Sequence, residues 1–299
     1  MDKLFTKMKR HARRMVQVGF ALLTNGNLAG FLRGRPYAGQ TKHVCVPGLD
    51  CYSCPGALGA CPIGAMQAVE GAPGFRFSCY VLGTVAVFGA LLGRYVCGWL
   101  CPFGLVQDLF HKIPFPKKLK KLPGDRWLKY GKYAALLILV LLLPAVITGT
   151  TGIGDPWFCK YVCPSGTLLG AVPLMLANPA LARAAGGLFA WKLAVLLVVL
   201  FLSVLVWRPF CRYLCPLGAL YGLLNPVAAL GFAVDATKCT RCGACRRACK
   251  LDIPTWQKPN SMECVRCGAC KRACPHGAIE TRCFGRTLRM GKKREPMAK

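Results

Sequence analysis

Two runs of cysteines near the C-terminal end of the chain have the spacing of ligands for [4Fe–4S] clusters. Each run has four cysteines in a 2-2-3 spacing, and the two runs, 239–249 and 264–274, match at 9 of 11 positions. In such runs three thiolates bind one cluster and the fourth binds the other. The predicted ligands are Cys239, Cys242, Cys245 and Cys274 for cluster 1, and Cys264, Cys267, Cys270 and Cys249 for cluster 2. Zinc is the alternative, but it does not require this 2-2-3 rhythm twice.

A Cys-Pro-x-Gly motif recurs four times in the rest of the chain. The motifs begin at Cys61, Cys101, Cys163 and Cys215. In the last three a second cysteine stands four residues earlier, at Cys97, Cys159 and Cys211, whereas Cys61 follows the series Cys45, Cys51 and Cys54. Because proline suits the first turn of a helix, each motif is predicted to open a short interfacial helix. The amides at such a helix start favour a thiolate or an anionic cluster.

The sequence between these motifs is apolar enough to cross a membrane. Of 299 residues, 54% are hydrophobic, although the net charge is +29. Helices of about 20 apolar residues span a bilayer, and four are predicted, over about 15–32, 77–94, 133–152 and 186–207. A signal peptide is the alternative for the first, but no clear cleavage site follows it. The charge lies between apolar runs rather than on one face, which disfavours a nucleic-acid partner.

The basic residues predict the orientation of these four helices. If the N-terminus is cytoplasmic, 33 of the 40 lysines and arginines lie in inside segments and 7 lie outside. This bias predicts a multi-pass protein of the cytoplasmic membrane with both termini in the cytoplasm, and it suits contact with anionic lipid. The Cys-Pro-x-Gly motifs then alternate outside, inside, outside, inside, as two repeats of a two-helix unit.

This topology predicts two further groups of thiols. The inner group is Cys97, Cys101, Cys211 and Cys215, a candidate third cluster in a compartment too reducing for disulfides. The outer group is Cys54, Cys61, Cys159 and Cys163, with Cys45 and Cys51 as additional candidates, and there plain disulfides are the alternative. The isolated Cys79 and Cys283 are predicted to be structural.

The expected fold is therefore an α-helical membrane domain joined to a small α+β domain. Residues 1–230 form the membrane domain, with four transmembrane helices in two repeats and interfacial helices. Residues 231–282 form a cytoplasmic ferredoxin-like domain for two [4Fe–4S] clusters, and 283–299 are a basic tail.

The combination of motifs resembles a known family. With the Cys-x3-Cys-Pro pairs, the segment Cys51-Tyr-Ser-Cys54-Pro-Gly-Ala57 and the tandem ferredoxin runs, the chain is similar to NapH-type polyferredoxin membrane proteins. These are related to NosR-type and CcoG-type membrane iron–sulfur proteins. The resemblance implies four transmembrane helices, inner Cys-x3-Cys-Pro motifs and electron transfer between a quinone pool or cytoplasmic donor and an extracytoplasmic reductase. The Cys159/Cys163 pair and the outer cysteines at 45–61 depart from the simplest family pattern.

Two functions compete on these observations. The first is an electron-transfer protein that links cytoplasmic [4Fe–4S] clusters with the quinone pool or an extracytoplasmic redox partner. No catalytic side chains are predicted, and a quinol dehydrogenase-like activity is left open. The alternative is a maturation factor that delivers electrons to a metal or disulfide during cofactor insertion, with the outer cysteines as redox-active thiols.

Overall fold

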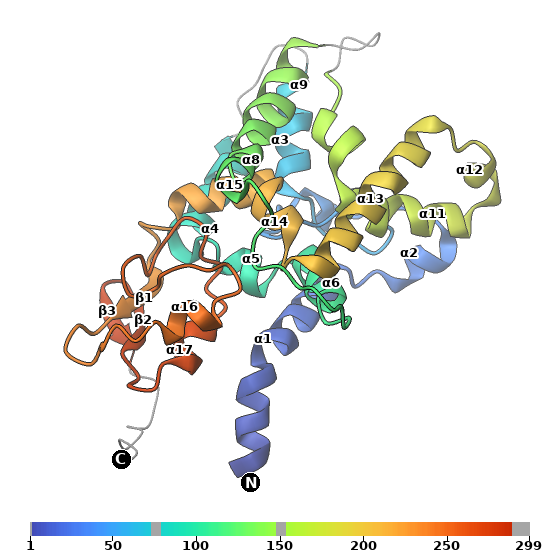
Figure 1. Cartoon of the computed structure of the whole chain (residues 1–299). Helices are drawn as coiled ribbons and strands as arrows, with labels where there is room; N and C mark the ends of the chain where they lie inside the picture. The colour runs from blue at the N-terminus through green and yellow to red at the C-terminus, as the bar shows by residue number, and fades with distance from the viewer. Residues whose placement is uncertain (1, 73–78, 148–153, 289–299) are drawn as a thin grey trace.

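The computed structural model describes residues 2–72, 79–147 and 154–288, and it is helical except for a small sheet near the C-terminus (Figure 1). The helices of the first half are α1 (Asp2–Thr24), α2 (Leu28–Arg33), η1 (Gln40–His43), α3 (Pro62–Glu70), α4 (Cys79–Leu92), α5 (Tyr95–Trp99), α6 (Pro102–Phe110), α7 (Asp125–Leu128), α8 (Gly131–Ala134), η2 (Ala135–Leu142) and α9 (Leu143–Val146). Those that follow are η3 (Phe158–Val162), α10 (Pro164–Gly166), η4 (Thr167–Ala171), α11 (Val172–Ala177), α12 (Pro179–Arg183), α13 (Gly187–Leu205), α14 (Pro209–Tyr213) and α15 (Pro216–Leu224).

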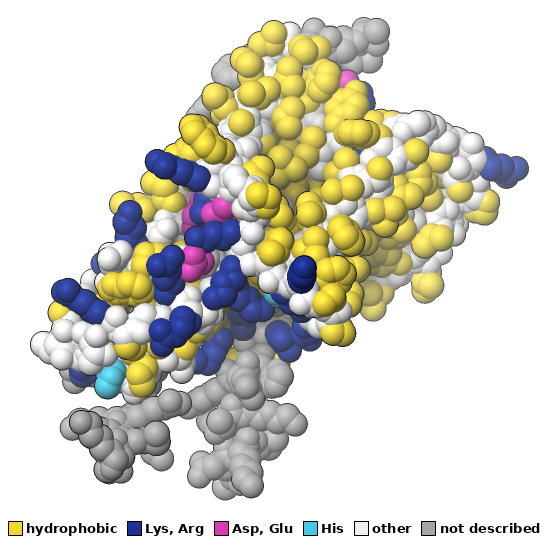
Figure 2. Space-filling view, viewed as in Figure 1, with side chains coloured by type: hydrophobic (Ala, Val, Ile, Leu, Met, Phe, Trp, Pro, Cys, Tyr) yellow, Lys and Arg dark blue, Asp and Glu magenta, His cyan; other side chains and the backbone are white. Residues whose placement is uncertain are grey.

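Within the described residues, two helices have the length and composition of a membrane span. They are Asp125–Val146, which runs from α7 to α9, and Gly187–Leu205, which is α13. Large apolar side chains on both face outward, such as Leu137, Val146 and Phe201. Figure 2 shows hydrophobic side chains over this upper part of the molecule, whereas lysines and arginines gather lower down, near the C-terminal domain. An apolar helix surface of this kind suits contact with lipid.

The first predicted helix differs from the structure. Instead of one helix over 15–32, α1 ends at Thr24 and α2 begins at Leu28. Thr24 Oγ1 donates to the Phe20 carbonyl at 3.0 Å, and Asn25 Nδ2 donates to the Ala21 carbonyl at 3.1 Å. Such side chains compete with the helical backbone for its hydrogen bonds, and the chain turns so that the Asn27 amide bonds to the Gly56 carbonyl.

The other predicted helices fit better. Helices α4 and α13 lie inside their predicted ranges, and the helix predicted over 133–152 begins earlier, at Asp125. Residues 77–78 and 148–152 of these predictions, and 289–299 of the predicted basic tail, lie outside the described part of the chain.

The short helices after the Cys-Pro-x-Gly motifs pack between the long helices. Helices α3 and α15 both contact α4 and η2, while α6 contacts α1 and α13, and α10 also contacts α13. Proline stands at the first turn of each of these four helices. Their apolar side chains are buried, including Ile63, Phe103 and Leu217. The motif cysteines are thus held inside the helical core.

The C-terminal domain carries the internal repeat predicted from its cysteine runs. Its three strands, β1 (Leu230–Val234), β2 (Ile279–Cys283) and β3 (Arg286–Leu288), pair antiparallel in the order β1-β2-β3, and its helices are α16 (Ala244–Ala248) and α17 (Ala269–Ala273). Arg241 and Arg266, equivalent in the two runs, share a left-handed backbone with φ of 53° and 51°. The two runs therefore have the same local backbone structure.

Candidate iron–sulfur sites

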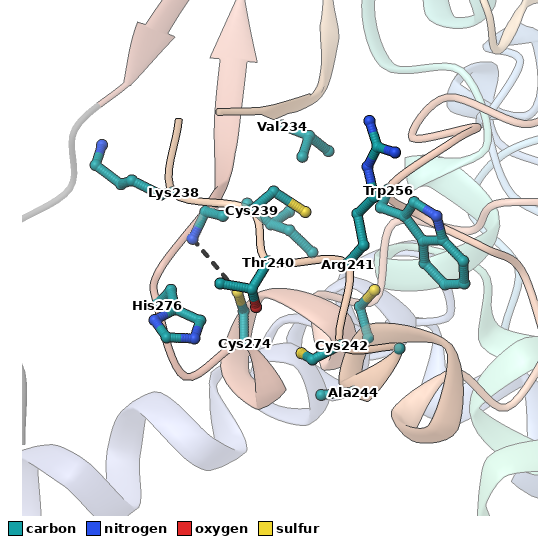
Figure 3. Close-up of a pocket in the computed structure, with 14 residues that line it drawn as sticks. Val234, Lys238, Cys239, Thr240, Arg241, Cys242, Ala244, Trp256, Cys274 and His276 are labelled. Carbon is teal, nitrogen blue, oxygen red and sulfur yellow. Dashed lines mark hydrogen bonds between the residues drawn. The ribbon is translucent and has the colours of Figure 1, made fainter. Parts of the chain in front are cut away.

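The four cysteines predicted for cluster 1 line one pocket of the C-terminal domain. Its walls come from Val234 and Ile279 of the sheet and from Trp256, and its thiols are Cys239, Cys242, Cys245 and Cys274. Figure 3 shows Cys239, Cys242 and Cys274 around this space. The Ala278 amide donates to Cys274 Sγ at 3.3 Å. Cys274 therefore joins the three cysteines of the other run, as the crossed pattern predicts.

The four cysteines predicted for cluster 2 also lie beside one another. Burial, together with the nearby thiolates of Cys249, Cys267 and Cys270, raises the pKa of Cys264 to about 12. Such mutual repulsion requires short distances between the sulfurs. Four thiols are thus available to each of two clusters.

The cluster 2 loop rests directly on α5, the helix that contains Cys97. A Cβ at Gly98 would overlap the Val265 carbonyl oxygen, so the two backbones are in contact there. Trp99 Nε1 donates to the Arg266 carbonyl at 3.1 Å, and Val265 is only 3% exposed. The predicted ligands of cluster 2 and the inner thiols therefore belong to one packed core.

A buried network of hydrogen bonds and an ion pair fixes the contact between the cluster 2 loop and the helical core. Asn225, at the end of α15, donates from Nδ2 to the Ser261 and Cys264 carbonyls at 2.7 and 3.0 Å, and its Oδ1 accepts from the Arg94 amide at 3.0 Å. The Arg94 guanidinium pairs with Glu263 at 2.9 Å. Burial alone would raise the pKa of Glu263, but the Arg94 and Lys132 cations bring it below its usual range. This network thus keeps the Glu263 carboxylate charged beside the cluster 2 loop.

The inner thiols Cys97, Cys101, Cys211 and Cys215 are fully packed and close together. Burial raises the pKa of Cys211 to about 11, and the Cys101 thiolate contributes to this rise. The same causes, burial first and then the thiolates of Cys211, Cys97 and Cys101, raise the pKa of Cys215. The helix starts predicted from the motifs supply main-chain donors, since the Gly104 and Gly218 amides both donate to a motif sulfur at 3.4 Å.

Two arginines that the sequence analysis did not single out brace the inner thiols. Arg94 Nη2 donates to the Cys211 carbonyl at 3.0 Å, and Arg208 Nη1 donates to the Cys97 carbonyl. Each arginine therefore holds the first cysteine of the other pair. The available signal was the shared spacing Arg-x2-Cys-x3-Cys-Pro-x-Gly, which starts at both Arg94 and Arg208.

Two glutamines that sequence reasoning also missed donate to cysteine sulfurs. Gln107 Nε2 donates to Cys211 Sγ at 3.0 Å, and Gln67 Nε2 donates to Cys159 Sγ at 3.2 Å. Each glutamine stands six residues after its motif cysteine, Cys101 or Cys61. This shared position was the signal in the sequence.

The outer group assembles with one member different from the sequence prediction. Cys61, Cys159 and Cys163 lie together, but the fourth thiol beside them is Cys51. Cys54 Sγ instead contacts Asn25 Oδ1 at 3.5 Å. The turn at Cys51–Cys54, closed by a bond from the Cys54 amide to the Cys51 carbonyl, directs the two side chains to different surroundings. Cys45, the other additional candidate, pairs through its backbone with Ala60.

Each of these groups has four thiols, the number that a [4Fe–4S] cluster binds. Among the described residues, no three His, Cys, Asp or Glu side chains converge closely enough to hold a single ion. In a [4Fe–4S] cluster each thiolate binds a different iron, so its sulfurs stand farther apart than the ligands of one zinc ion. All 20 cysteines are unpaired thiols.

Comparison with known proteins agrees with this chemistry. A family described as "4Fe-4S binding domain" matches residues 80–123, 136–174 and 188–232, and another of the same description matches 258–280. Each of the first three segments contains an apolar helix and a Cys-x3-Cys-Pro pair. The chain is 30% identical to an uncharacterised protein of Methanocaldococcus jannaschii, over 61% of this chain and 69% of that protein.

Relatives named as ferredoxin-type proteins identify the family. The chain is 28% identical to the ferredoxin-type protein NapH of Escherichia coli, over 55% of this chain and 50% of NapH. The chain belongs to the NapH-type polyferredoxin family. It is also 30% identical to the methylamine utilization ferredoxin-type protein MauN of Paracoccus denitrificans, over 58% of this chain and 57% of MauN.

These matches cover only part of each relative, so the specific functions of the relatives are not assigned to this polyferredoxin. The chain spans about half the length of the NapH and MauN proteins that it matches. No solved structure matches it. The family assignment therefore supports ferredoxin-type electron transport in general terms.

The Gln107 hydrogen bond gives a first test of the inner site. Hydrogen bonds to the sulfurs help to set the reduction potential of a bound cluster, and a bond to a charged group contributes about 1.5–3 kcal/mol. If the inner thiols hold a cluster, we expect Gln107→Leu to lower its midpoint potential by up to about 100 mV, because a tenfold change in the equilibrium constant corresponds to 59 mV for a one-electron couple. Redox titration followed by electron paramagnetic resonance measures this shift, and an unchanged potential would show that the bond is absent.

Proposed function

We propose that this polyferredoxin carries electrons between cytoplasmic [4Fe–4S] clusters and the membrane quinone pool or an extracytoplasmic redox partner. The contact between the cluster 2 loop and α5 carries this proposal. Val265 and Arg266, between two predicted ligands of cluster 2, touch Gly98 and Trp99, which follow Cys97 directly. The two sets of thiols are thus neighbours through packed backbone.

The residues divide between those that would hold clusters and those that fix their spacing. Cys239, Cys242, Cys245 and Cys274 would hold cluster 1, Cys249, Cys264, Cys267 and Cys270 would hold cluster 2, and Cys97, Cys101, Cys211 and Cys215 would hold the inner cluster. A bound [4Fe–4S] cluster supplies reversible one-electron chemistry in which no covalent bond forms or breaks. Asn225 and Arg94 hold the two domains in register, and burial of Val265 excludes water from the contact.

The apolar surface supports placement of the helical domain in the membrane. We infer four crossings, formed by residues 15–32 at the end of α1 and in α2, by α4, by the helix Asp125–Val146 and by α13, with both termini in the cytoplasm. The outward-facing leucines and valines of the last two helices and the bias of basic residues toward one side support this topology. Impermeant thiol reagents test it, because exposed Cys79 should be labelled only from the side opposite to half-buried Cys283, and neither cysteine is a proposed cluster ligand. Labelling of both from one side would overturn the topology.

Loss of one inner ligand tests the proposed function directly. We expect Cys97→Ala to lower the iron content of purified protein by about four atoms per chain, because a cubane holds four irons. The two ferredoxin-domain clusters should remain, but their reoxidation by an added quinone should slow strongly.

Cys79→Ala is the matched control, since this exposed cysteine belongs to none of the four-thiol groups. Iron analysis and stopped-flow absorbance supply the two readouts. Unchanged iron in Cys97→Ala would contradict the inner cluster, and unchanged reoxidation despite lost iron would contradict its place in the electron path.

A further inference from the structure

The outer thiols are arranged like the inner thiols in detail. In the inner group, the glutamine six residues after Cys101 donates to the first cysteine of the facing pair, Cys211, at 3.0 Å. In the outer group, the glutamine six residues after Cys61 donates to the first cysteine of its facing pair, Cys159, at 3.2 Å. At both sites, therefore, a glutamine at the same position in the helix after one motif binds the first cysteine of the facing motif.

Cys51 completes the outer group, because its sulfur and that of Cys163 border the same glycine, Gly166. A Cβ at Gly166 would lie 3.6 Å from Cys51 Sγ and 4.0 Å from Cys163 Sγ, so one position borders both sulfurs. A Cβ at Gly64 would likewise lie 3.9 Å from Cys159 Sγ. Both glycines are the last residue of a Cys-Pro-x-Gly motif. The missing side chains leave room beside the sulfurs where a cluster requires it.

The charge of the outer thiols also favours a bound cluster. Cys61 and Cys163 are buried, and Cys51 and Cys159 are half-buried. Four thiolates in such a place would be costly without a cation, whereas the positive iron core of a cluster would offset most of their charge. Lys192 Nζ, which donates to the Cys159 carbonyl at 3.2 Å, adds a cation nearby.

A single stretch of chain separates the outer from the inner thiols. A Cβ at Gly48 would lie 3.2 Å from Pro102 Cδ and 3.4 Å from Cys101 Cα, so this segment packs directly on an inner motif. The Leu49 carbonyl faces the outer side, where it accepts from Ser165 Oγ at 3.5 Å. Tyr221, wholly buried, donates from its hydroxyl to the Pro47 carbonyl at 3.0 Å. The segment 47–49 is thus packed between the two groups.

We propose that Cys51, Cys61, Cys159 and Cys163 hold a fourth [4Fe–4S] cluster, adjacent to the inner one. This deepens the proposed function and rests on it, because the fourth cluster gives the electron path its outward end. The exchange balances as one electron lost by the donor cluster and one gained by its neighbour, with no bond formed or broken and no proton moved.

Cys51 and Cys54 form a matched pair for the test. Both lie in one turn, but only Cys51 lies with the outer thiols. We expect about 16 irons per chain in the wild-type protein and in Cys54→Ala, and about 12 in Cys51→Ala, at four irons per cluster. Cys159→Ala is a second variant of the same site and should lose the same four irons. Iron and labile-sulfide analysis of anaerobically purified protein gives these counts.

Three results would overturn the fourth cluster. One is wild-type iron in both Cys51→Ala and Cys159→Ala, and another is an equal loss in Cys51→Ala and Cys54→Ala. The third is a disulfide among Cys51, Cys61, Cys159 and Cys163, detected by alkylation and mass spectrometry. The Cys97→Ala variant separates this failure from that of the proposed function, because it tests the inner cluster while the outer ligands stay intact.

Discussion

Gly98→Ala is expected to interrupt electron transfer between the C-terminal domain and the helical core without removing any cluster ligand. The added methyl group would meet the Val265 carbonyl oxygen, a backbone atom that cannot swing aside like a flexible side chain. Overpacking of this kind costs about 1–3 kcal/mol. That cost corresponds to a fall of about 5- to 150-fold in the docked population.

Gly83→Ala is the control for this variant, because a Cβ at Gly83 meets nothing within 4 Å. Both proteins should keep wild-type iron. Only Gly98→Ala should slow the arrival of electrons at the inner cluster, followed by freeze-quench electron paramagnetic resonance after reduction of the C-terminal domain. Wild-type kinetics in Gly98→Ala would mean that the contact at α5 is not the electron route.

Arg208→Met is expected to destabilise the protein strongly, because it leaves a buried carboxylate without its main partner. The buried guanidinium donates to both carboxylate oxygens of Asp108, at 2.9 and 2.7 Å, and also to the Cys97 carbonyl. Removing one partner of a buried ion pair costs about 3–5 kcal/mol, because the remaining charge is left with weaker compensation. We expect a matching loss in the free energy of unfolding, together with loss of the inner cluster.

The control for Arg208→Met is Arg183→Met, at an exposed position of α12. Arg208→Lys keeps the charge but not the two-pronged geometry, so its stability should fall between those of wild type and Arg208→Met. Denaturant titration gives the energies and iron analysis the occupancy. Equal stability of Arg208→Met and Arg183→Met would contradict the bracing role of Arg208.

The Asp108–Arg208 pair also has a defined pH dependence. Burial alone would raise the pKa of Asp108, but the Arg208 and Arg13 cations hold it below its usual value. Because folding lowers this pKa, the pair stabilises the protein above the ordinary aspartate pKa of about 4. That stability is lost as the pH falls through the lowered value.

Sequence spacing gives a definite prediction for the ferredoxin part because its proposed ligands are local. In each predicted set, three of the four cysteines lie within seven residues of one run, and the fourth comes from the other run. The two runs are repeats, with nearly equal backbone φ angles at Arg241 and Arg266. The helices α4 and α13 were predictable for a similar reason, since their apolar composition is continuous.

The outer group could not be fixed from sequence because its members meet only through tertiary packing. Cys51 and Cys54 stand three residues apart in one turn, and their spacing to Cys61 does not distinguish them as ligands. The choice between them depends on that turn and on Gly166, which is more than a hundred residues away. The end of α1 at Thr24 was missed likewise, because the backbone bonds that fix the turn after it reach the distant Gly56 and Leu58.

Electron transfer across sealed liposomes tests the whole series of thiol groups most directly. Liposomes containing the protein would trap ferricyanide, and titanium(III) citrate added outside would reduce clusters in those molecules whose C-terminal domain faces outward. We expect the trapped ferricyanide to be reduced by the wild-type protein and by Cys54→Ala, and only at the protein-free rate by Cys51→Ala and Cys97→Ala. Reduction at the protein-free rate by the wild type, or at the wild-type rate by Cys51→Ala and Cys97→Ala, would contradict an electron path through these groups.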